Sequence, residues 1–183
     1  MNRHLILAIM FATALSVSAC NEQQAEIALP NPVALTEEAV GHYCNMTIVE
    51  HTGPKAQIHL AGNPNPIWFS QVRDGIAFIK SPEEHDDYVA VYVNDMGKAT
   101  DWDFPADDTW IDANLAWFVI GSRITGGMGA PEVIPFGSEE SASAFVTENG
   151  GAMVRLADIP DAYVLGPTGL DEQASYPITG ATQ

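Results

Sequence analysis

Three sulfur-bearing side chains lie in sequence surroundings that suit a soft metal ion. Cys44 and Met46 are two residues apart, so an extended segment would place both side chains on one face. Met128 lies in the run Gly-Gly-Met-Gly-Ala-Pro-Glu at residues 126–132, whose glycines allow other groups to approach the backbone closely. A thiolate combined with thioethers is a soft ligand set that selects Cu(I) over zinc or magnesium. The pattern favours one Cu(I) site of two or three sulfurs, with Cys44, Met46 and Met128 as ligands.

The sequence leaves a fourth ligand open. Glu132, four residues after Met128, is a candidate either to complete the site or to support it from outside the ligand shell. His42 is a further candidate, because imidazole also suits copper. The competing interpretation is that the sulfurs are packing residues, that Met128 belongs to a tight turn and that His42 is a surface residue.

The chain carries no common enzyme motif. CxxC, HExxH, GxSxG, GxGxxG and the P-loop are all absent from the sequence. Cys44 and His42 could be imagined as a nucleophile and its base, but two residues at this spacing on one strand rarely reach the required geometry, and no third orienting group is evident. We therefore expect a protein that is not an enzyme.

Charge and composition narrow the class of partner. The chain has 183 residues, and 24 acidic against 7 basic side chains give a formal net charge of -17. Nucleic-acid binding needs a basic footprint, so no nucleic-acid partner is expected. A hydrophobic content of 46% predicts a folded core, and only two cysteines argue against a disulfide framework.

The N-terminus has the pattern of a bacterial lipoprotein signal peptide, assigned to residues 1–19. Its apolar stretch, residues 5–15, is too short to span a membrane as a mature helix. The run Val-Ser-Ala-Cys at residues 17–20 resembles a lipobox, in which the peptidase cuts before the cysteine and lipid is attached to its thiol. Cys20 is the predicted lipidation site. The alternative is an ordinary signal peptide followed by a chance cysteine.

The segment after the cleavage site is expected to be a tether. Residues 20–40 comprise the lipidated cysteine and a stretch rich in Asn, Gln, Glu, Ala and Pro, a composition typical of flexible linkers. The sequence therefore predicts a lipid-anchored protein of the bacterial cell envelope that faces the periplasm. Asn21 slightly favours the outer over the inner membrane.

The rest of the chain divides into two related halves, residues 41–100 and residues 101–165. Aligned matches link the halves: Phe69 with Phe136, Ala77 with Ala144 and Phe78 with Phe145. The repeated pattern predicts an α+β fold of two related small ββαβ units packed together in one mature chain. The second range begins with a linking loop, and residues 166–183 are expected to form a loose tail.

Local signals place the elements of the two units. Apolar or β-branched residues cluster in the segments expected to contain strands: residues 46–49, 56–61, 88–93, 111–120 and 152–156. Ser70 and Ser138 precede the two expected helices, and each is a residue type that caps helix N-termini.

The chain resembles the NosL family of nitrous oxide reductase accessory lipoproteins over roughly residues 40–165. The most discriminating match is the glycine-rich run that contains Met128. The other matching parts are the lipobox, Cys44-Asn45-Met46, Trp68-Phe69 and Ile134-Pro135-Phe136. The resemblance implies two small α+β units and Cu(I) binding by Cys44, Met46 and Met128.

The resemblance also implies a role and partners. It implies a copper chaperone, or metallochaperone, that serves denitrification by delivering copper for the copper–sulfide centre of nitrous oxide reductase. It further implies docking to the membrane-associated ABC-type complex that matures the reductase. Two alternatives stay open. One is a lipid-anchored adapter of that complex without direct metal transfer, and the other is a thiol-dependent enzyme with a fold like that of organomercurial lyase.

Overall fold

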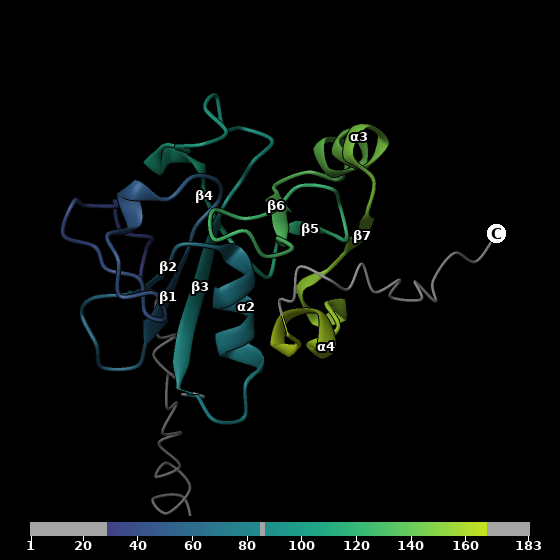
Figure 1. The fold of residues 1–183 in the computed structure, drawn as a ribbon. Coiled ribbons are helices and arrows are strands. Elements are labelled where there is room, and N and C mark those ends of the chain that lie inside the picture. Colours follow the sequence, from purple (N-terminus) through teal and green to yellow (C-terminus); the bar gives the residue numbers. More distant parts are fainter. Residues whose placement is uncertain (1–28, 85–86, 168–183) are drawn as a thin grey trace, which may run out of the picture.

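The computed structural model describes residues 29–84 and 87–167. The signal peptide and Cys20 lie outside this part of the chain. The described residues form two antiparallel sheets, each accompanied by a helix (Figure 1). The predicted α+β class with two sheet-plus-helix units is confirmed.

The first unit contains a four-stranded sheet and one helix. Its elements are β1 (Ala56–Leu60), β2 (Ile67–Phe69), α2 (Val72–Lys80), β3 (Tyr88–Asn94) and β4 (Trp110–Asp112). The strand order is β2-β1-β3-β4, so β2 lies at one edge. This edge position matters because β2 leads directly into α2.

The second unit repeats the same element order with a smaller sheet. Its elements are β5 (Trp117–Ile120), β6 (Ile134–Phe136), α3 (Glu139–Asn149) and β7 (Ala152–Val154). The strand order is β6-β5-β7. In both sheets the first strand of the unit lies between the second and the third, and all pairings are antiparallel. The shared topology confirms the repeated ββαβ pattern.

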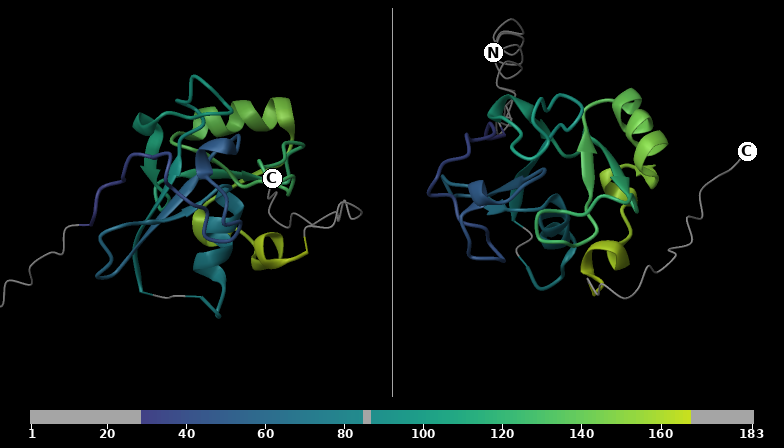
Figure 2. Two further views of the ribbon diagram at one scale, coloured as in Figure 1. Left: turned by 60° about the vertical axis from the view of Figure 1, so that its left-hand side comes forward. Right: turned by 45° about the horizontal axis from the view of Figure 1, so that its top comes forward.

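Short helical segments connect and close the two units. They are η1 (Ile48–Glu50), η2 (Asp107–Thr109), η3 (Leu156–Asp158) and α4 (Asp161–Leu165). Helix α4 packs against α2, so the C-terminal end of the described chain returns to the first unit (Figure 2). No helix among the described residues combines the length and the apolar character needed to cross a membrane.

Two expected strands differ from the structure. Residues 46–49 form a bend, an isolated bridge between Thr47 and Val40 and the start of η1, because their hydrogen bonds are made with residues 39–41 and not with a sheet. The expected strand at 111–120 is split into β4 and β5, which belong to different sheets. The break is a local turn, in which the Asp112 side chain accepts a hydrogen bond from the Asn114 amide at 2.8 Å.

The two helices begin differently. Ser138 caps α3 as expected, with its hydroxyl oxygen accepting from the Ser141 amide at 3.2 Å. The expectation for Ser70 is wrong, since the N-cap residue of α2 is Gln71 and its side chain makes no cap hydrogen bond. The first turn of α2 must therefore find its acceptor elsewhere.

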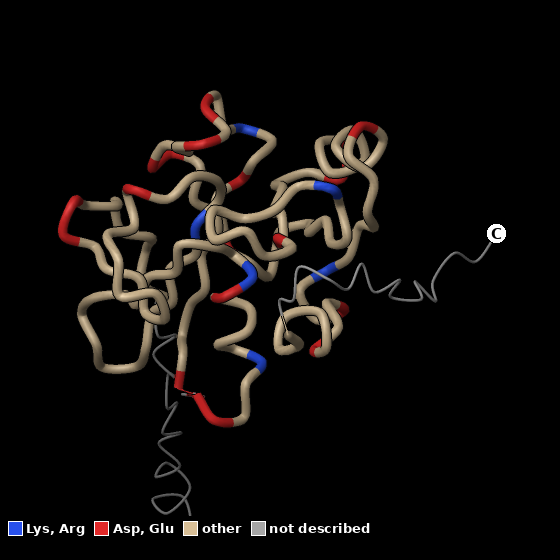
Figure 3. Tube along the Cα trace, viewed as in Figure 1, with Lys and Arg blue, Asp and Glu red and all other residues tan. Residues whose placement is uncertain are grey.

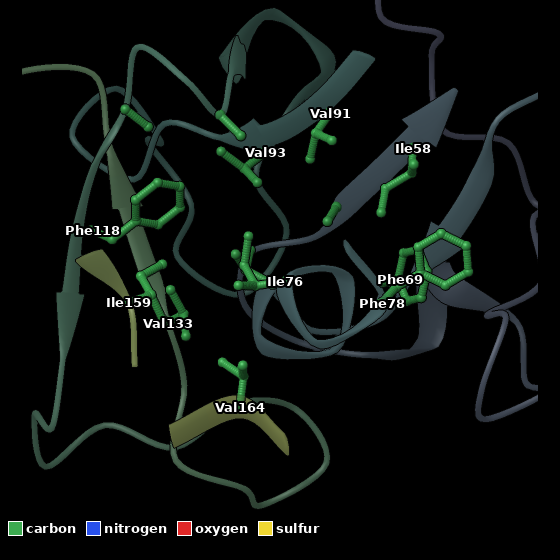
Figure 4. Close-up of a cluster of buried hydrophobic side chains, with 14 of the residues drawn as sticks. Ile58, Phe69, Ile76, Phe78, Val91, Val93, Phe118, Val133, Ile159 and Val164 are labelled. Carbon is green, nitrogen blue, oxygen red and sulfur yellow. The ribbon is translucent and has the colours of Figure 1, made fainter. Parts of the chain in front are cut away.

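One hydrophobic core joins the two units. Ile58 and Ile76 of the first unit share a buried cluster with Phe118 and Val133 of the second (Figure 4). A second cluster, between α3 and its sheet, includes Phe136. Because the main cluster draws on both sheets, neither unit buries its apolar face alone, and we expect the halves to unfold together.

The surface keeps the acidic character of the whole chain. Lys55 and Arg73 are buried, but so are Asp95 and Glu132, so burial leaves the excess of acidic over basic side chains unchanged. In Figure 3 most of the red segments, which mark Asp and Glu, lie at the periphery of the view, on loops and on helices. The protein therefore presents a largely negative face to its surroundings.

The shared core predicts a single unfolding transition. Phe118→Ala, in the second unit, should lower the free energy of unfolding by about 3–5 kcal/mol, and Ile58→Ala, in the first, by about 2–5 kcal/mol. Urea denaturation followed by tryptophan fluorescence and by circular dichroism measures both changes. The exposed Leu115 gives the control, because Leu115→Ala should change stability by less than about 0.5 kcal/mol. Two separate transitions, with only one of them shifted by each core variant, would contradict a common core.

Candidate metal-binding site

The segments that carry Cys44 and Met128 meet at the N-terminus of α2. Cys44 Sγ lies 3.8 Å from Ser70 Oγ. The backbone amide of Met128 donates to Gln71 Oε1 at 3.1 Å. Ser70 and Gln71 are adjacent and immediately precede the helix. Two sulfur residues that are far apart in the sequence are therefore attached to neighbouring positions.

Cys44 lies in a tight turn at residues 40–47, which we call the Cys44 turn. Two hydrogen bonds of 2.9 Å close it, from the Gly41 amide to the Met46 carbonyl and from the Asn45 amide to the Gly41 carbonyl. Asn45 has a positive φ of 53°. The segment is thus not extended, and the alternation that would place the side chains of Cys44 and Met46 on one face does not apply.

The edge of the first sheet holds the Cys44 turn in place. The His42 amide donates to the carbonyl of Trp68 in β2 at 2.7 Å, and Gly41 forms a parallel bridge with the same residue. A Cβ on Gly41 would lie 2.4 Å from Cys44 Sγ, so a larger residue at position 41 would displace the thiol from its present place. Since β2 continues into Ser70, the strand positions both the Cys44 turn and the serine that the thiol faces.

Met128 lies at the tip of a second closed loop, residues 125–131, which we call the Met128 loop. The Gly126 amide donates to the Ala130 carbonyl, and the Gly129 amide donates to the Gly126 carbonyl, both at 2.8 Å. Gly129 has a φ of +79°, a conformation that strongly favours glycine. The loop therefore presents the Met128 side chain outward on a hydrogen-bonded frame.

Exposure separates the methionines of the described ranges into two groups. Met46 and Met128 are 40% and 44% exposed. Met96 is only 5% exposed, and Met153 packs against the second core cluster. A methionine normally contributes by filling apolar space. The two that do not are those beside Cys44 and within the glycine-rich run.

Glu132 lies beneath the Met128 loop and supplies the acceptor that the first turn of α2 needs. Its Oε1 accepts hydrogen bonds from the backbone amides of Arg73 and Val133, each at 2.8 Å. Oε2 is buried and has no hydrogen-bond partner among the described residues. Burial raises the pKa of Glu132 to about 8, although the two amide hydrogen bonds oppose this shift. The carboxyl group is thus a cap for α2 that comes from the other unit.

His42 and Cys44 have different partners. The His42 ring packs against the rings of Tyr43, Phe69 and Phe78, and its Nε2 lies 3.9 Å from a carboxylate oxygen of Glu84. The thiol of Cys44 faces Ser70 instead. This arrangement shows no hydrogen bond that would make His42 the base of a nucleophilic Cys44.

Ser70, Gln71 and Gly41 contribute to the geometry although sequence reasoning did not place them at the site. The only signal was the expected helix start at Ser70, which was interpreted as a cap. Across residues 29–84 and 87–167, no group of three or more His, Cys, Asp or Glu side chains is arranged to hold a metal ion.

Comparison with known proteins settles the family. The NosL family model matches residues 32–164, which is most of the chain. The chain belongs to the NosL family. The copper-binding lipoprotein NosL of Achromobacter cycloclastes is 49% identical over 170 residues, covering 91% of this chain and 87% of that protein. The copper-binding lipoprotein NosL of Stutzerimonas stutzeri is 30% identical and covers 86% and 80%, respectively.

A solved NosL structure supports the family assignment in three dimensions. The crystal structure of the copper chaperone NosL from Shewanella denitrificans is 34% identical to this chain and has a TM-score of 0.68. The match covers 72% of this chain and 97% of that one. The two sheet-plus-helix units of this NosL family member are therefore consistent with a solved relative.

Glu132→Gln should flatten the pH dependence of stability. The folded chain keeps a proton on Glu132 up to about pH 8, whereas the unfolded chain loses it near the ordinary pKa of 4.5. This group therefore destabilises the fold as the pH rises between those values, by on the order of a few kcal/mol. Urea denaturation at about pH 5 and about pH 8 should show a smaller loss in the variant than in the wild type. Equal losses would contradict the pKa shift.

Proposed function

We propose that this NosL family member binds one Cu(I) ion through Cys44, Met46 and Met128 and delivers it for assembly of the copper–sulfide centre of nitrous oxide reductase. The observation that carries the proposal is the exposure of Met46 and Met128, together with the contacts of Cys44 with Ser70 and of Met128 with Gln71. The relatives named copper-binding lipoprotein and copper chaperone support it.

The ligand types suit the proposed cargo. A thiolate with thioethers is soft and matches Cu(I) better than zinc or magnesium. Cys44 is half-buried, and its contacts to Ser70 Oγ and the Met46 carbonyl, at 3.8 and 4.0 Å, are long ones. Copper binding would therefore displace little existing bonding. In this proposal Glu132 supports the Met128 loop from beneath.

The exposure of the site suits transfer of the ion. A partner's ligand can approach an exposed copper ion before the first ligand leaves, and a neutral thioether leaves without needing a proton. The acidic surface would steer the chain toward a basic surface on its partner and raise the rate of encounter at low ionic strength. A shallow site with few soft ligands can thus hold a Cu(I) ion and still pass it to a partner.

The proposed setting is the periplasmic face of the cell envelope. A lipid on Cys20 would anchor the chain, which accords with the lipoprotein names of its relatives. The proposed partners are nitrous oxide reductase and the membrane-associated ABC-type complex that matures it. On this proposal the chain is a carrier and not an enzyme.

An anaerobic Cu(I) competition titration against a chromogenic chelator tests the site. The purified wild type should bind one equivalent. Cys44→Ser should weaken binding most, because it removes the only charged ligand, and Met128→Leu and Met46→Leu should weaken it less. Met153→Leu is the matched control and should leave the affinity unchanged, since that side chain packs in the second core cluster.

The same titration can reject the proposal. A wild type that binds no copper, or whose affinity is the same after Cys44→Ser and Met128→Leu, would leave the sulfurs without a ligand role. The adapter interpretation would then be preferred, and normal partner binding by a chain lacking all three sulfurs would support it.

A further inference from the structure

We propose that Gln71 is a positioning residue that holds Met128 at a fixed place relative to Cys44, an inference that rests on the proposed copper site. Gln71 is buried, and its side chain accepts a hydrogen bond from the backbone amide of Met128, not from the sulfur that would bind the metal. Its role is to fix the geometry of the site and not to bind the metal.

Both ends of the Gln71 amide are used. Oε1 accepts from the Met128 amide at 3.1 Å, and Nε2 donates to Asp74 Oδ2 at 3.1 Å. Asp74 belongs to the first turn of α2. The carboxylate of Asp74 accepts from the NH₂ end, which leaves the carbonyl end for Met128. The Met128 loop is thereby attached to the helix through one oriented amide.

The glycine-rich run provides a second, independent observation. A Cβ on Gly126 would lie 2.5 Å from Gln71 Oε1 and 3.1 Å from its amide carbon. The loop backbone therefore packs directly on the side chains of Gln71 and Glu132, since the same Cβ would lie 2.5 Å from Glu132 Oε2, and a larger residue at position 126 would push on both. This contact gives a structural reason for the first glycine of the run that contains Met128.

Because Ser70 precedes Gln71, the hydrogen bond from Met128 to Gln71 also affects the distance between the Met128 loop and the Cys44 turn. Ser70 faces Cys44 Sγ, and Gln71 holds the Met128 amide, so the separation of the two loops is set at consecutive residues. Ligands held in place before the metal arrives bind it more tightly, because less freedom is lost on binding. Loss of an outer partner of a metal site typically costs about 10–100-fold in affinity.

A double-mutant cycle tests this role on the full chain, with Cu(I) affinity as the readout. The four proteins are the wild type, Gln71→Ala, Met128→Leu and the double variant. Gln71→Ala should weaken Cu(I) binding by about 10-fold or more. In the Met128→Leu background the same change should have little further effect, since the sulfur that it positions is already gone.

Gln57→Ala is the matched control. Gln57 is also buried, and its amide holds the backbone of Val33 by two hydrogen bonds of 2.8 and 2.9 Å. It should lower the melting temperature and leave the Cu(I) affinity unchanged. Gly126→Ala is the second variant, because it disturbs the same contact from the loop side. Its Cβ would also lie 2.5 Å from Glu132 Oε2, so its melting temperature is measured beside its affinity. It should repeat the loss of affinity and its dependence on Met128.

The outcomes separate this inference from the proposed function. Unchanged affinity in both Gln71→Ala and Gly126→Ala, or an equal loss with and without Met128, would overturn the role of Gln71 alone. A wild type without Cu(I) binding, or one indifferent to Met128→Leu, would overturn the copper site and the role of Gln71 with it. If Gln71→Ala does not fold, Gly126→Ala decides.

Discussion

The carboxyl group of Glu132 joins the two units at the N-terminus of α2. A helix start needs acceptors for its first amides, and α2 has none from its own N-cap side chain. Glu132 supplies one from the second unit and accepts from its own neighbour, Val133, with the same oxygen. The contact links the start of α2 to the end of the Met128 loop, beside the hydrophobic core that also joins the two units.

The hydrophobic core and the surface beside α2 differ in how they treat large apolar side chains. The main core buries large apolar side chains from both sheets, and the second cluster encloses Met96. Beside α2 the chain instead leaves Met46 and Met128 substantially exposed, which forgoes the stabilisation that their burial would bring. The buried core thus supports a surface on which two methionine side chains stay exposed, where packing alone would favour their burial.

The sequence predicted the repeated ββαβ pattern because β-branched strands and the Ser138 cap are local signals. It did not predict the turn at residues 46–49, since that turn depends on pairing with the edge strand β2. Ser70 was misassigned as a cap because the actual acceptor, Glu132, comes from the other unit. The sulfur residues could be chosen as candidates by type and by the glycine-rich surroundings of Met128, although the extended geometry expected for Cys44 and Met46 is wrong. The place of Gln71 could not, because it follows from how the two units pack.

The capping hydrogen bond from Arg73 to Glu132 spans 59 positions, and this separation has a consequence for the order of assembly. Synthesis proceeds from the N-terminus, so the Cys44 turn and α2 are made well before the Met128 loop. Closing so long a loop costs entropy that only later packing recovers. A chain whose second half has not yet folded therefore offers only Cys44 and Met46 of the proposed site and lacks Met128 in its place. All three proposed ligands of Cu(I) would come together only when the second unit packs against the first. The chain could then bind copper fully only after its fold is complete.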